Sequence, residues 1–168
     1  MMMPPIIIDI EASGFGAGSY PIEIGYVDRC GQPWCSLIAP RDDWLHWNKT
    51  AEMLHQISRE MLVAHGKSAE VVANHLNDTF LNQTIYSDGW LHDFTWLNCL
   101  FHAAGVSPHF KCQDLRVVLT PFQQSVWHHT KQRILNEAQI SRHRASSDAQ
   151  LLQMTWLKTA KMEAYICA

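Results

Sequence analysis

The sequence predicts an α/β fold in which a mixed five-stranded sheet is flanked by helices. Near its N-terminus the chain carries three short apolar runs separated by turn-forming residues, a pattern typical of a strand meander. Beyond them, stretches with helical periodicity alternate with short strand-like runs, which is typical of strands joined by helices. With 168 residues, 47% of them hydrophobic, the chain can bury a full core, so we expect one domain over residues 1–168.

The meander is expected to consist of three strands. The first, at 6–11, is a β-branched run that begins directly after Pro5. The second and third, at 22–27 and 34–38, are separated by a segment at 28–33 that is rich in Asp, Gly and Pro. Strands joined by turns this short run antiparallel to each other.

Helical periodicity begins after the meander. The features predicted up to residue 81 are a helical stripe that begins with Ala51, Leu54 and Ile57, a helix over 59–64 capped by Ser58, and a longer helix capped by Ser68. The features predicted after it are a strand at 84–87, a helix at 91–104 ended by Gly105, a strand at 110–113, a short helix over 115–119 capped by Asp114, and helices at 123–137 and 145–160.

Composition and charge limit the kinds of molecule that the protein is expected to bind and the compartment in which it is expected to work. The net charge of −3 and the pI near 6.3 exclude the broad basic surface of a protein that grips long duplexes, so any nucleic-acid contact should be small and local. The five cysteines form no Cys-x-x-Cys pair, and their odd number favours a reducing compartment, so we expect a cytoplasmic protein. The N-terminal segment has neither the basic region of a signal peptide nor an apolar run long enough for a membrane span.

Two acids, Asp9 and Glu11, stand at the end of the first predicted strand. Side chains in a strand alternate between its two faces, so these carboxylates are expected on the same face, where they could bind a hard cation. The alternative is that Glu11 lies beyond the strand in solvent. Asp9, however, directly follows three isoleucines, where an unpaired charge is costly to bury.

Two further segments supply acids and a histidine. Asp93 opens the helix at 91–104, where the helix dipole alone would also favour a carboxylate. Asp88, on the preceding turn, competes for the same role, but it lacks the flanking apolar register, so we favour Asp93. His143 lies in a basic loop, and Asp148 follows in the first turn or so of an amphipathic helix. A general base on a loop beside a metal ligand on a helix would be arranged in this way.

These five residues predict a metal site. At an effective dielectric of about 20, two like charges about 4 Å apart repel by roughly 4 kcal/mol, so carboxylates gathered in one place need divalent cations or a shared proton. We interpret Asp9, Glu11, Asp93 and Asp148 as ligands of a two-metal site and His143 as a catalytic residue beside it.

Five segments of the chain carry a family resemblance: 7–14 (IIDIEASG), 21–25 (PIEIG), 54–62 (LHQISREML), 93–97 (DFTWL) and 143–149 (HRASSDA). In this order they resemble the signatures of the DEDDh 3′–5′ exonucleases. That superfamily includes the DNA polymerase III proofreading subunit, ribonuclease T and oligoribonuclease, and it has a ribonuclease H-like fold. The resemblance runs from residue 6 to about residue 152.

The sequence departs from the family pattern in three places. Ala12-Ser13-Gly14 replaces the usual Thr-Thr-Gly, and the segment 15–19 replaces an acid-rich loop. The second motif lacks the familiar Asn before its aspartate and reads Asp88-Gly89-Trp90-Leu91-His92. The resemblance is therefore a firmer guide to fold and cleavage chemistry than to the substrate.

The resemblance implies roles for individual residues. Asp9, Glu11 and Asp148 would hold one Mg²⁺ or Mn²⁺, and Asp9, with Asp93 acting through a water molecule, would hold a second. His143 would act as the base, since an imidazole can take a proton from water near neutral pH.

The substrate-contacting residues expected in this setting are Phe15, Ser13, Gly14 and Trp90. Phe15 matches the family position that lies against the terminal base, where a ring would stack without reading sequence. The alternative for Phe15 is an exposed or core-edge ring with no substrate contact. Lys131, Arg133, Arg142 and Arg144 could line a phosphate path near the active loop, although an ordinary solvated helix face explains the first two equally well.

The function predicted from the sequence is that of a metal-dependent 3′–5′ exonuclease. It would remove nucleoside 5′-monophosphates from the 3′ ends of single-stranded DNA or RNA. One alternative is a catalytically weak nucleic-acid-binding or adaptor domain with the same fold, and another is a phosphoesterase that acts on small nucleotides. Small members of the superfamily often dimerise, so the resemblance leaves a homodimer open.

Overall fold

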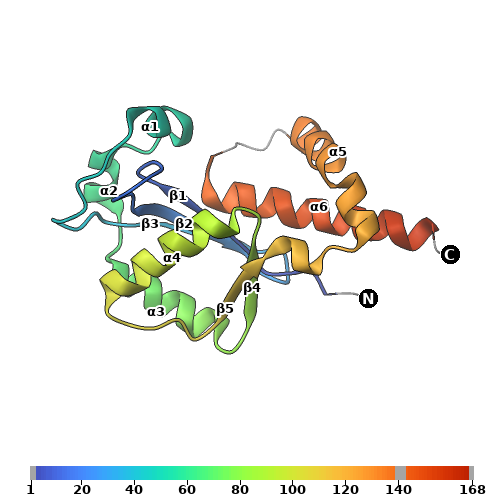
Figure 1. Ribbon diagram of the computed structural model, residues 1–168, viewed down its shortest axis with the longest axis horizontal. Coiled ribbons are helices and arrows are strands. Elements are labelled where there is room, and N and C mark those ends of the chain that lie inside the picture. The colour runs from blue at the N-terminus through green and yellow to red at the C-terminus, as the bar shows by residue number, and fades with distance from the viewer. Residues whose placement is uncertain (1–2, 139–142, 167–168) are drawn as a thin grey trace.

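The computed structural model describes residues 3–138 and 143–166 (Figure 1). Its centre is a five-stranded sheet with the strand order β3-β2-β1-β4-β5. The strands are β1 (Ile7–Ala12), β2 (Pro21–Val27), β3 (Pro33–Leu37), β4 (Thr84–Ser87) and β5 (Lys111–Asp114). Each strand lies within one residue of its predicted position, so the strands expected from the sequence are confirmed.

The sheet is mixed, as predicted. β1, β2 and β3 form an antiparallel meander, whereas β4 runs parallel to β1 and β5 runs parallel to β4. In the β1–β2 pair, Asp9 lies opposite Gly25 and Glu11 lies opposite Glu23. Residues directly opposite each other in an antiparallel pair share a face of the sheet. These four residues therefore belong to the same face.

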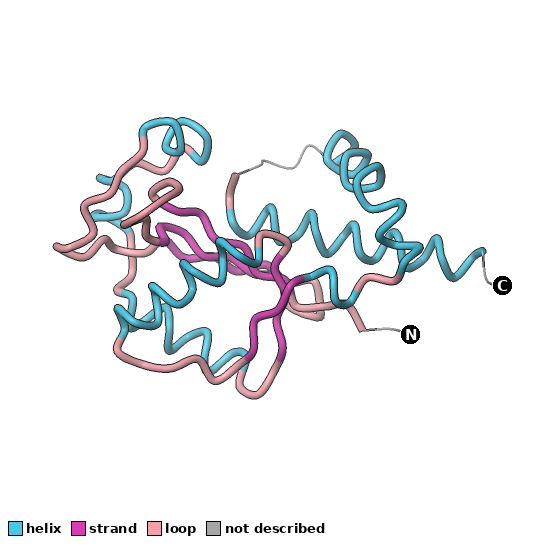
Figure 2. Tube along the Cα trace, in the orientation of Figure 1, coloured by secondary structure: helices cyan, strands magenta, loops and turns pink. Residues whose placement is uncertain are grey.

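Helices cover both faces of the sheet (Figure 2). They are α1 (Lys49–His55), α2 (Arg59–His65), α3 (Ala69–Phe80), α4 (Trp90–Ala104), the 3₁₀ helix η1 (Leu115–Val118), α5 (Pro121–Ala138) and α6 (Ala145–Ile166). α3 and α4 pack together on one face, α6 packs on β1 and β2 from the other, and α5 packs on α6 (Figure 1). The predicted α/β architecture is confirmed.

The alternation of β1 decides where its acids point. Ile8 and Ile10 belong to the larger core with α3 and α4, whereas Ile7 packs with Ala149 and Leu152 of α6. Asp9 and Glu11 have the same parity as Ile7, so they point to the side of the sheet that α6 covers. Glu11 lies within β1, and the alternative that placed it beyond the strand is wrong.

Several predicted helix ends are confirmed by their hydrogen bonds. The Met61 N–H donates to Ser58 Oγ (3.2 Å), and the Val71 N–H donates to Ser68 Oγ (3.3 Å). α4 ends at Gly105, which has a φ of 68°. A residue with a Cβ is strained in this left-handed conformation, and glycine is not.

One predicted helical stripe is wrong. Ala51 and Leu54 lie in α1, but this helix ends at His55 because Gln56 adopts a left-handed conformation. Ile57 is buried beyond the helix end, and Leu54 is exposed. At the other end of the chain, α5 begins at Pro121 and α6 continues to Ile166, so both are longer than predicted. No helix in the described ranges is long and apolar enough to cross a membrane.

Candidate functional site

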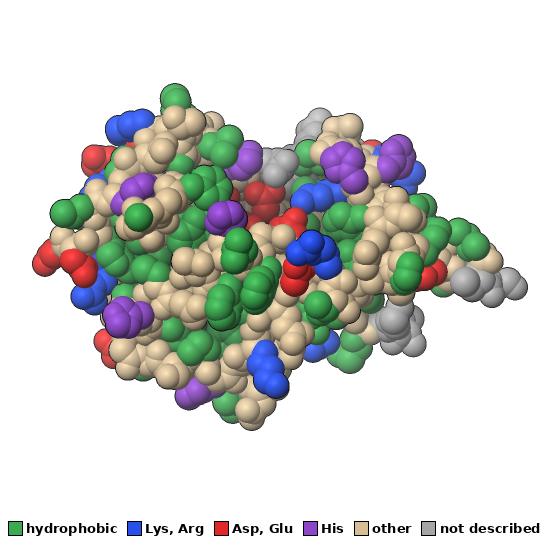
Figure 3. Space-filling view, viewed as in Figure 1, with side chains coloured by type: hydrophobic (Ala, Val, Ile, Leu, Met, Phe, Trp, Pro, Cys, Tyr) green, Lys and Arg blue, Asp and Glu red, His purple; other side chains and the backbone are tan. Residues whose placement is uncertain are grey.

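A pocket of about 300 Å³ opens beside the acids of β1. Its polar lining residues are Asp9, Glu11, His55, Asp88, His92, Asp93, Lys131, His143 and Asp148. Figure 3 shows a hollow near the middle of the molecule, where acidic side chains gather beside lysine or arginine side chains. The structure thus brings the four predicted metal ligands and the predicted base to one place, although β1, α4 and α6 are far apart in the sequence.

Asp9 is one of the two acids of β1 that line this pocket. Burial is the main factor that raises its pKa, to well above the ordinary value. The negative charges of Asp93, Glu11, Asp148 and Asp88 raise the pKa of Asp9 further, in that order of importance. A carboxylate in this setting favours either a proton or a bound cation over an unpaired negative charge.

Asp93 lies in the first turn of α4 and is only 4% exposed. Its backbone N–H donates to the Gly89 carbonyl, and the Ser87 hydroxyl donates to its Oδ2 atom. Burial raises the pKa of Asp93 to about 7, with smaller contributions from Asp88 and Glu11, against the opposing effect of the Ser87 hydrogen bond. Any Cβ at Gly89 would lie 3.2 Å from Asp93 Oδ2, so glycine leaves room for this carboxylate.

His143 and Asp148 lie at the start of α6. The His143 N–H donates to Asp148 Oδ2 (2.8 Å), and His143 adopts a φ of 63°. One ligand atom each from Glu11, His143 and Asp148 lies within 4.8 Å of the others. Asp148 therefore orders the backbone of His143 and also offers an oxygen to the same small volume as Glu11.

Residues of β2 fix where α6 begins. Glu23 is 1% exposed and accepts hydrogen bonds from the Arg144 guanidinium (2.6 and 3.1 Å) and from the Ala145 N–H (2.9 Å). Beside it, a Cβ on Gly25 would lie 2.6 Å from the Ala145 carbonyl carbon and closer still to the Ser146 nitrogen. The helix start thus rests directly on the β2 backbone. These contacts hold His143 and Asp148 beside the acids of β1.

Phe15 forms an aromatic ledge at the pocket with His92 and Trp96. Phe15 is 68% exposed, and its ring centroid lies 5.0 Å from that of His92 and 5.7 Å from that of Trp96. The Trp96 Nε1–H donates to Ser19 Oγ (3.0 Å), which ties the ledge to the loop after β1. An exposed ring on a fixed support is suited to stacking against a flat ligand.

The other predicted substrate contacts lie outside the pocket lining. Ser13 is buried, and its Oγ contacts His46 Nδ1 (2.9 Å) and accepts from the Tyr20 N–H (3.1 Å). A Cβ on Gly14 would lie 2.6 Å from Asn48 Cβ, so Gly14 permits close packing of the loop. The Trp90 ring stacks on Phe94 with a centroid distance of 5.3 Å. A direct substrate contact by Ser13, Gly14 or Trp90 stays a prediction.

The basic residues expected along a phosphate path differ in their ion-pair partners and in whether they line the pocket. Arg144 is paired with Glu23, and Arg133 lies near Glu137 at 3.6 Å and does not line the pocket. Lys131 lines the pocket and forms an ion pair with Asp88. Arg142 lies outside the described residues.

His55 lines the pocket, although its position in the sequence predicts no role for it. It is buried, and its Nδ1 accepts from the Ile57 N–H (3.1 Å), so the proton of the neutral ring lies on Nε2. Within residues 3–138 and 143–166, that Nε2 atom has no hydrogen-bond partner. Burial lowers the pKa of His55, which favours the neutral ring. The only sequence signal for this histidine is its place in the segment 54–62, which carries part of the family resemblance.

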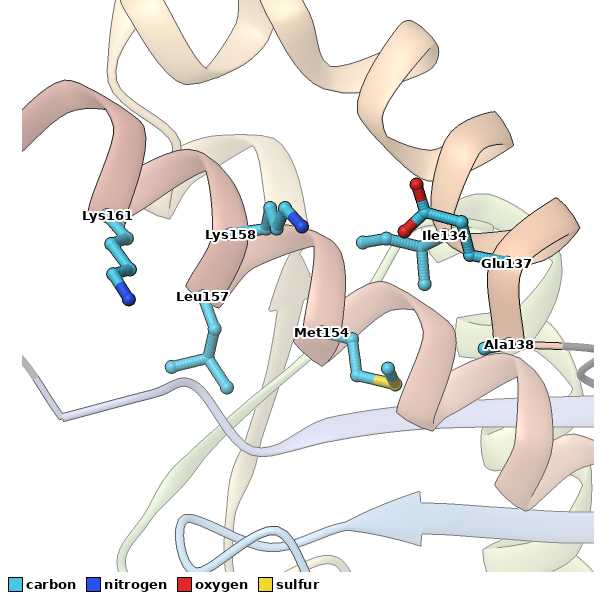
Figure 4. Close-up of a pocket in the computed structure, with 7 residues that line it drawn as sticks. All are labelled: Ile134, Glu137, Ala138, Met154, Leu157, Lys158 and Lys161. Carbon is cyan, nitrogen blue, oxygen red and sulfur yellow. The ribbon is translucent and has the colours of Figure 1, made fainter.

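A larger groove of about 410 Å³ lies between α5 and α6 (Figure 4). Ile134, Met154 and Leu157 give it apolar walls, and its charged residues are Glu137, Lys158 and Lys161. With a single carboxylate in its lining, this groove lacks the donor set of a site for two hard cations.

The raised pKa of Asp93 predicts an unusual dependence of stability on pH. Between about pH 4 and pH 7 the folded state keeps a proton that the unfolded chain loses, so the free energy of unfolding should fall as the pH rises through this window. The slope is at most about 1.4 kcal/mol per pH unit for one such proton. Urea unfolding in EDTA at pH 5 and pH 7.5 would measure this fall.

Asp93→Asn is the matched variant for this measurement, because its amide cannot titrate. The fall in stability should be smaller in Asp93→Asn than in the wild-type protein. Equal pH dependence in the two proteins would show that Asp93 does not keep its proton in the folded state.

The fold is similar to that of solved structures of exonuclease I. One structure, described in terms of processivity, aligns with a TM-score of 0.70 and 15% identity over 96% of this chain and 41% of the other. An E. coli exonuclease I complex with a dA16 oligonucleotide aligns with a TM-score of 0.71 and 14% identity over 96% of this chain and 41% of the other. The zinc-bound form of an E. coli exonuclease I complex with single-stranded DNA aligns with a TM-score of 0.65 and 14% identity over 98% of this chain and 42% of the other.

These similarities show the ribonuclease H-like fold. The chain spans about two fifths of the exonuclease I chains that it matches. The sequence matches no family model and no curated protein.

Proposed function

We propose that this chain is a metal-dependent 3′–5′ exonuclease of the DEDDh superfamily, which releases nucleoside 5′-monophosphates from single-stranded DNA or RNA. One observation carries the proposal: Asp9, Glu11, Asp93, Asp148 and His143 line the same pocket, in which burial and neighbouring acids raise the pKa of Asp9 and of Asp93. A passive binding domain gains nothing from this repulsion, whereas a metal-dependent nuclease requires the acids. The fold shared with exonuclease I supports the same reading.

The donor set fits divalent cations that prefer oxygen ligands. Glu11 and Asp148 offer ligand atoms close enough for one ion to bridge. Asp9 lines the same pocket, outside the group of ligand atoms that lie within 4.8 Å of one another. Asp9, Glu11 and Asp148 would hold one Mg²⁺ or Mn²⁺, and Asp9 with Asp93 would hold the second. When bound, the two cations would supply Lewis acidity for attack by water and for departure of the 3′ oxygen.

His143 would act as the general base. Its side chain lines the pocket beside Glu11 and Asp148, and its backbone is held by the hydrogen bond to Asp148. A neutral imidazole in this position can accept the proton that the attacking water loses. Because Asp148 holds the backbone of His143, it would position the base as well as a cation.

The ledge of Phe15, His92 and Trp96 supports a base-stacking role at the 3′ end. A ring that stacks on a base does so with little sequence preference. The pocket volume of about 300 Å³ suits a single nucleotide unit, in agreement with the small and local nucleic-acid contact expected from the net charge of −3. The substrate would thus be the free end of a single strand.

Cleavage of 5′-labelled single-stranded DNA and RNA oligomers tests this proposal. With Mn²⁺ we expect a ladder that shortens from the 3′ end, release of nucleoside 5′-monophosphates and no cleavage in EDTA. A small chromogenic phosphodiester separates this activity from that of a phosphoesterase on small nucleotides. Binding of the oligomers without metal-dependent cleavage of any of the three substrates would contradict the proposal and favour the adaptor function.

A further inference from the structure

Lys131 is the one lysine or arginine among the described residues that line the acid pocket. It projects from α5, a helix that supplies none of the proposed metal ligands. We propose that Lys131 binds a backbone phosphate of the strand in this pocket and that Asp88 holds the lysine in position. This inference rests on the proposed function and assigns a substrate-binding role to a residue pair outside the metal site.

The geometry of the pair places the ammonium group at the pocket edge. Lys131 Nζ donates to Asp88 Oδ2 at 2.9 Å, and the two side chains are 23% and 37% exposed. Asp88 follows directly after β4, and its charge raises the pKa of both Asp9 and Asp93, so the pair lies close to the metal site. A phosphate adjacent to the scissile one would therefore pass near Lys131.

The ammonium group can bind Asp88 and a phosphate at the same time. Lysine carries three N–H donors, and the contact with Asp88 uses one of them. Asp88 limits the rotamers of the long side chain before the strand arrives, which reduces the entropy lost on binding. Lys131 does not have to leave its partner in order to reach the phosphate.

The charges around the pocket favour this role for Lys131. Five carboxylates line the pocket, and an approaching polyanion is repelled by any of them that cations do not neutralise. Arg144 forms its ion pair with buried Glu23, and Arg133 lies outside the pocket lining. Among the lysine and arginine side chains that the structure describes, Lys131 is therefore best placed to offset this repulsion.

A purely structural role is the competing explanation. The ion pair joins α5 to the turn between β4 and α4, and it could simply hold the helix in place. An exposed pair of this kind contributes about 1 kcal/mol or less to stability. In that case, removing either partner would have the same effect, because each substitution breaks the same contact.

Steady-state cleavage by Lys131→Ala and Asp88→Asn separates the two explanations. For Lys131→Ala we expect KM to rise about tenfold, which is the loss of one charge-assisted hydrogen bond, with kcat within about threefold of the wild-type value. The slope of log KM against log salt should decrease by about 0.7. Asp88→Asn should raise KM less than Lys131→Ala, and Lys131→Arg should restore most of the affinity. Arg133→Ala removes the same charge from the same helix and should leave KM unchanged.

Uncharged methylphosphonate linkages, introduced one at a time, identify the phosphate. At one linkage the substitution should weaken wild-type binding but have no further effect on Lys131→Ala. Two results would overturn the inference: equal KM changes in Lys131→Ala and Asp88→Asn with an unchanged salt slope, or a Lys131→Ala effect that persists at every linkage. If the wild-type protein binds oligomers without cleaving them, the proposed function fails, and the same comparison of variants by fluorescence anisotropy still tests Lys131.

Discussion

Asp9→Asn is expected to abolish cleavage and at the same time to stabilise the metal-free protein. Asp9 is the proposed ligand shared by both cations, so we expect kcat to fall by about a thousandfold or more, which corresponds to about 4 kcal/mol of transition-state stabilisation. In EDTA the neutral amide avoids the cost of burying a charge and the repulsion from four neighbouring acids, so the melting temperature should rise. Each kcal/mol gained is worth about 2–4 °C in a protein of this size.

Oligomer cleavage and thermal unfolding in EDTA measure the two effects on the same preparations. Asp78→Asn is the matched control, because Asp78 is an exposed residue of α3 that does not line the pocket. Asp78→Asn should have the same cleavage rate and the same melting temperature in EDTA as the wild-type protein. Cleavage by Asp9→Asn at more than a tenth of the wild-type rate, or a lower melting temperature in EDTA, would contradict the role assigned to Asp9.

Gly25→Ala is expected to disrupt the site without touching any proposed ligand. The new Cβ would lie 2.6 Å from the Ala145 carbonyl carbon, and backbone atoms on both sides cannot move aside cheaply. The start of α6 would have to shift and carry His143 and Asp148 with it. We expect a loss of about 1–3 kcal/mol in stability and a fall in kcat of about a hundredfold, since displacements of about 1 Å at a reacting centre have effects of that size.

Gly105→Ala is the control for the Gly25 variant. Gly105 has a φ of 68°, and a Cβ there would meet no atom within 4 Å. This substitution should cost about 1 kcal/mol from backbone strain and leave kcat unchanged. Wild-type kcat in Gly25→Ala would mean that the close contact between β2 and α6 does not position the site.

Much of the fold and the grouping of the acids follow from local sequence patterns. Asp9 and Glu11 share a face because side chains in a strand alternate, and both residues lie in β1 as the sequence predicts. Ser58 and Ser68 begin helices because their side chains satisfy free N–H groups nearby in the chain. Alternation and capping act over a few residues, which is why a single sequence reveals them.

The support of the site depends on contacts that are distant in sequence. In the sequence Glu23 is a single polar residue within a strand, and nothing nearby indicates that it is buried. Its burial is tolerated because Arg144 and Ala145, more than a hundred residues later, donate hydrogen bonds to it. The sequence alone therefore suggests a phosphate path for Arg144, whereas in the structure its partner is Glu23. Lys131 of α5 contacts Asp88 of the β4–α4 turn. Nothing in the sequence of either segment indicates that the two segments are in contact.

The helical stripe predicted from Ala51 to Ile57 failed for a local reason. Apolar spacing suggested a continuous helix, but Gln56 adopts a left-handed conformation that ends α1 at His55. This turn buries both His55 and Ile57. In this segment the apolar spacing does not show where the helix stops, and Leu54, although part of the stripe, is exposed.

We expect the pocket lined by Asp9, Glu11, Asp93 and Asp148 to bind two divalent cations. Calorimetric titration of the metal-free protein with Mn²⁺, in the presence of a nucleoside 5′-monophosphate, measures how many ions bind. We expect two bound ions per chain in the wild-type protein and a loss of both in Asp9→Asn, with Asp78→Asn unchanged. If the wild-type protein binds no more Mn²⁺ than Asp9→Asn does, the acids of this pocket do not form a two-metal site.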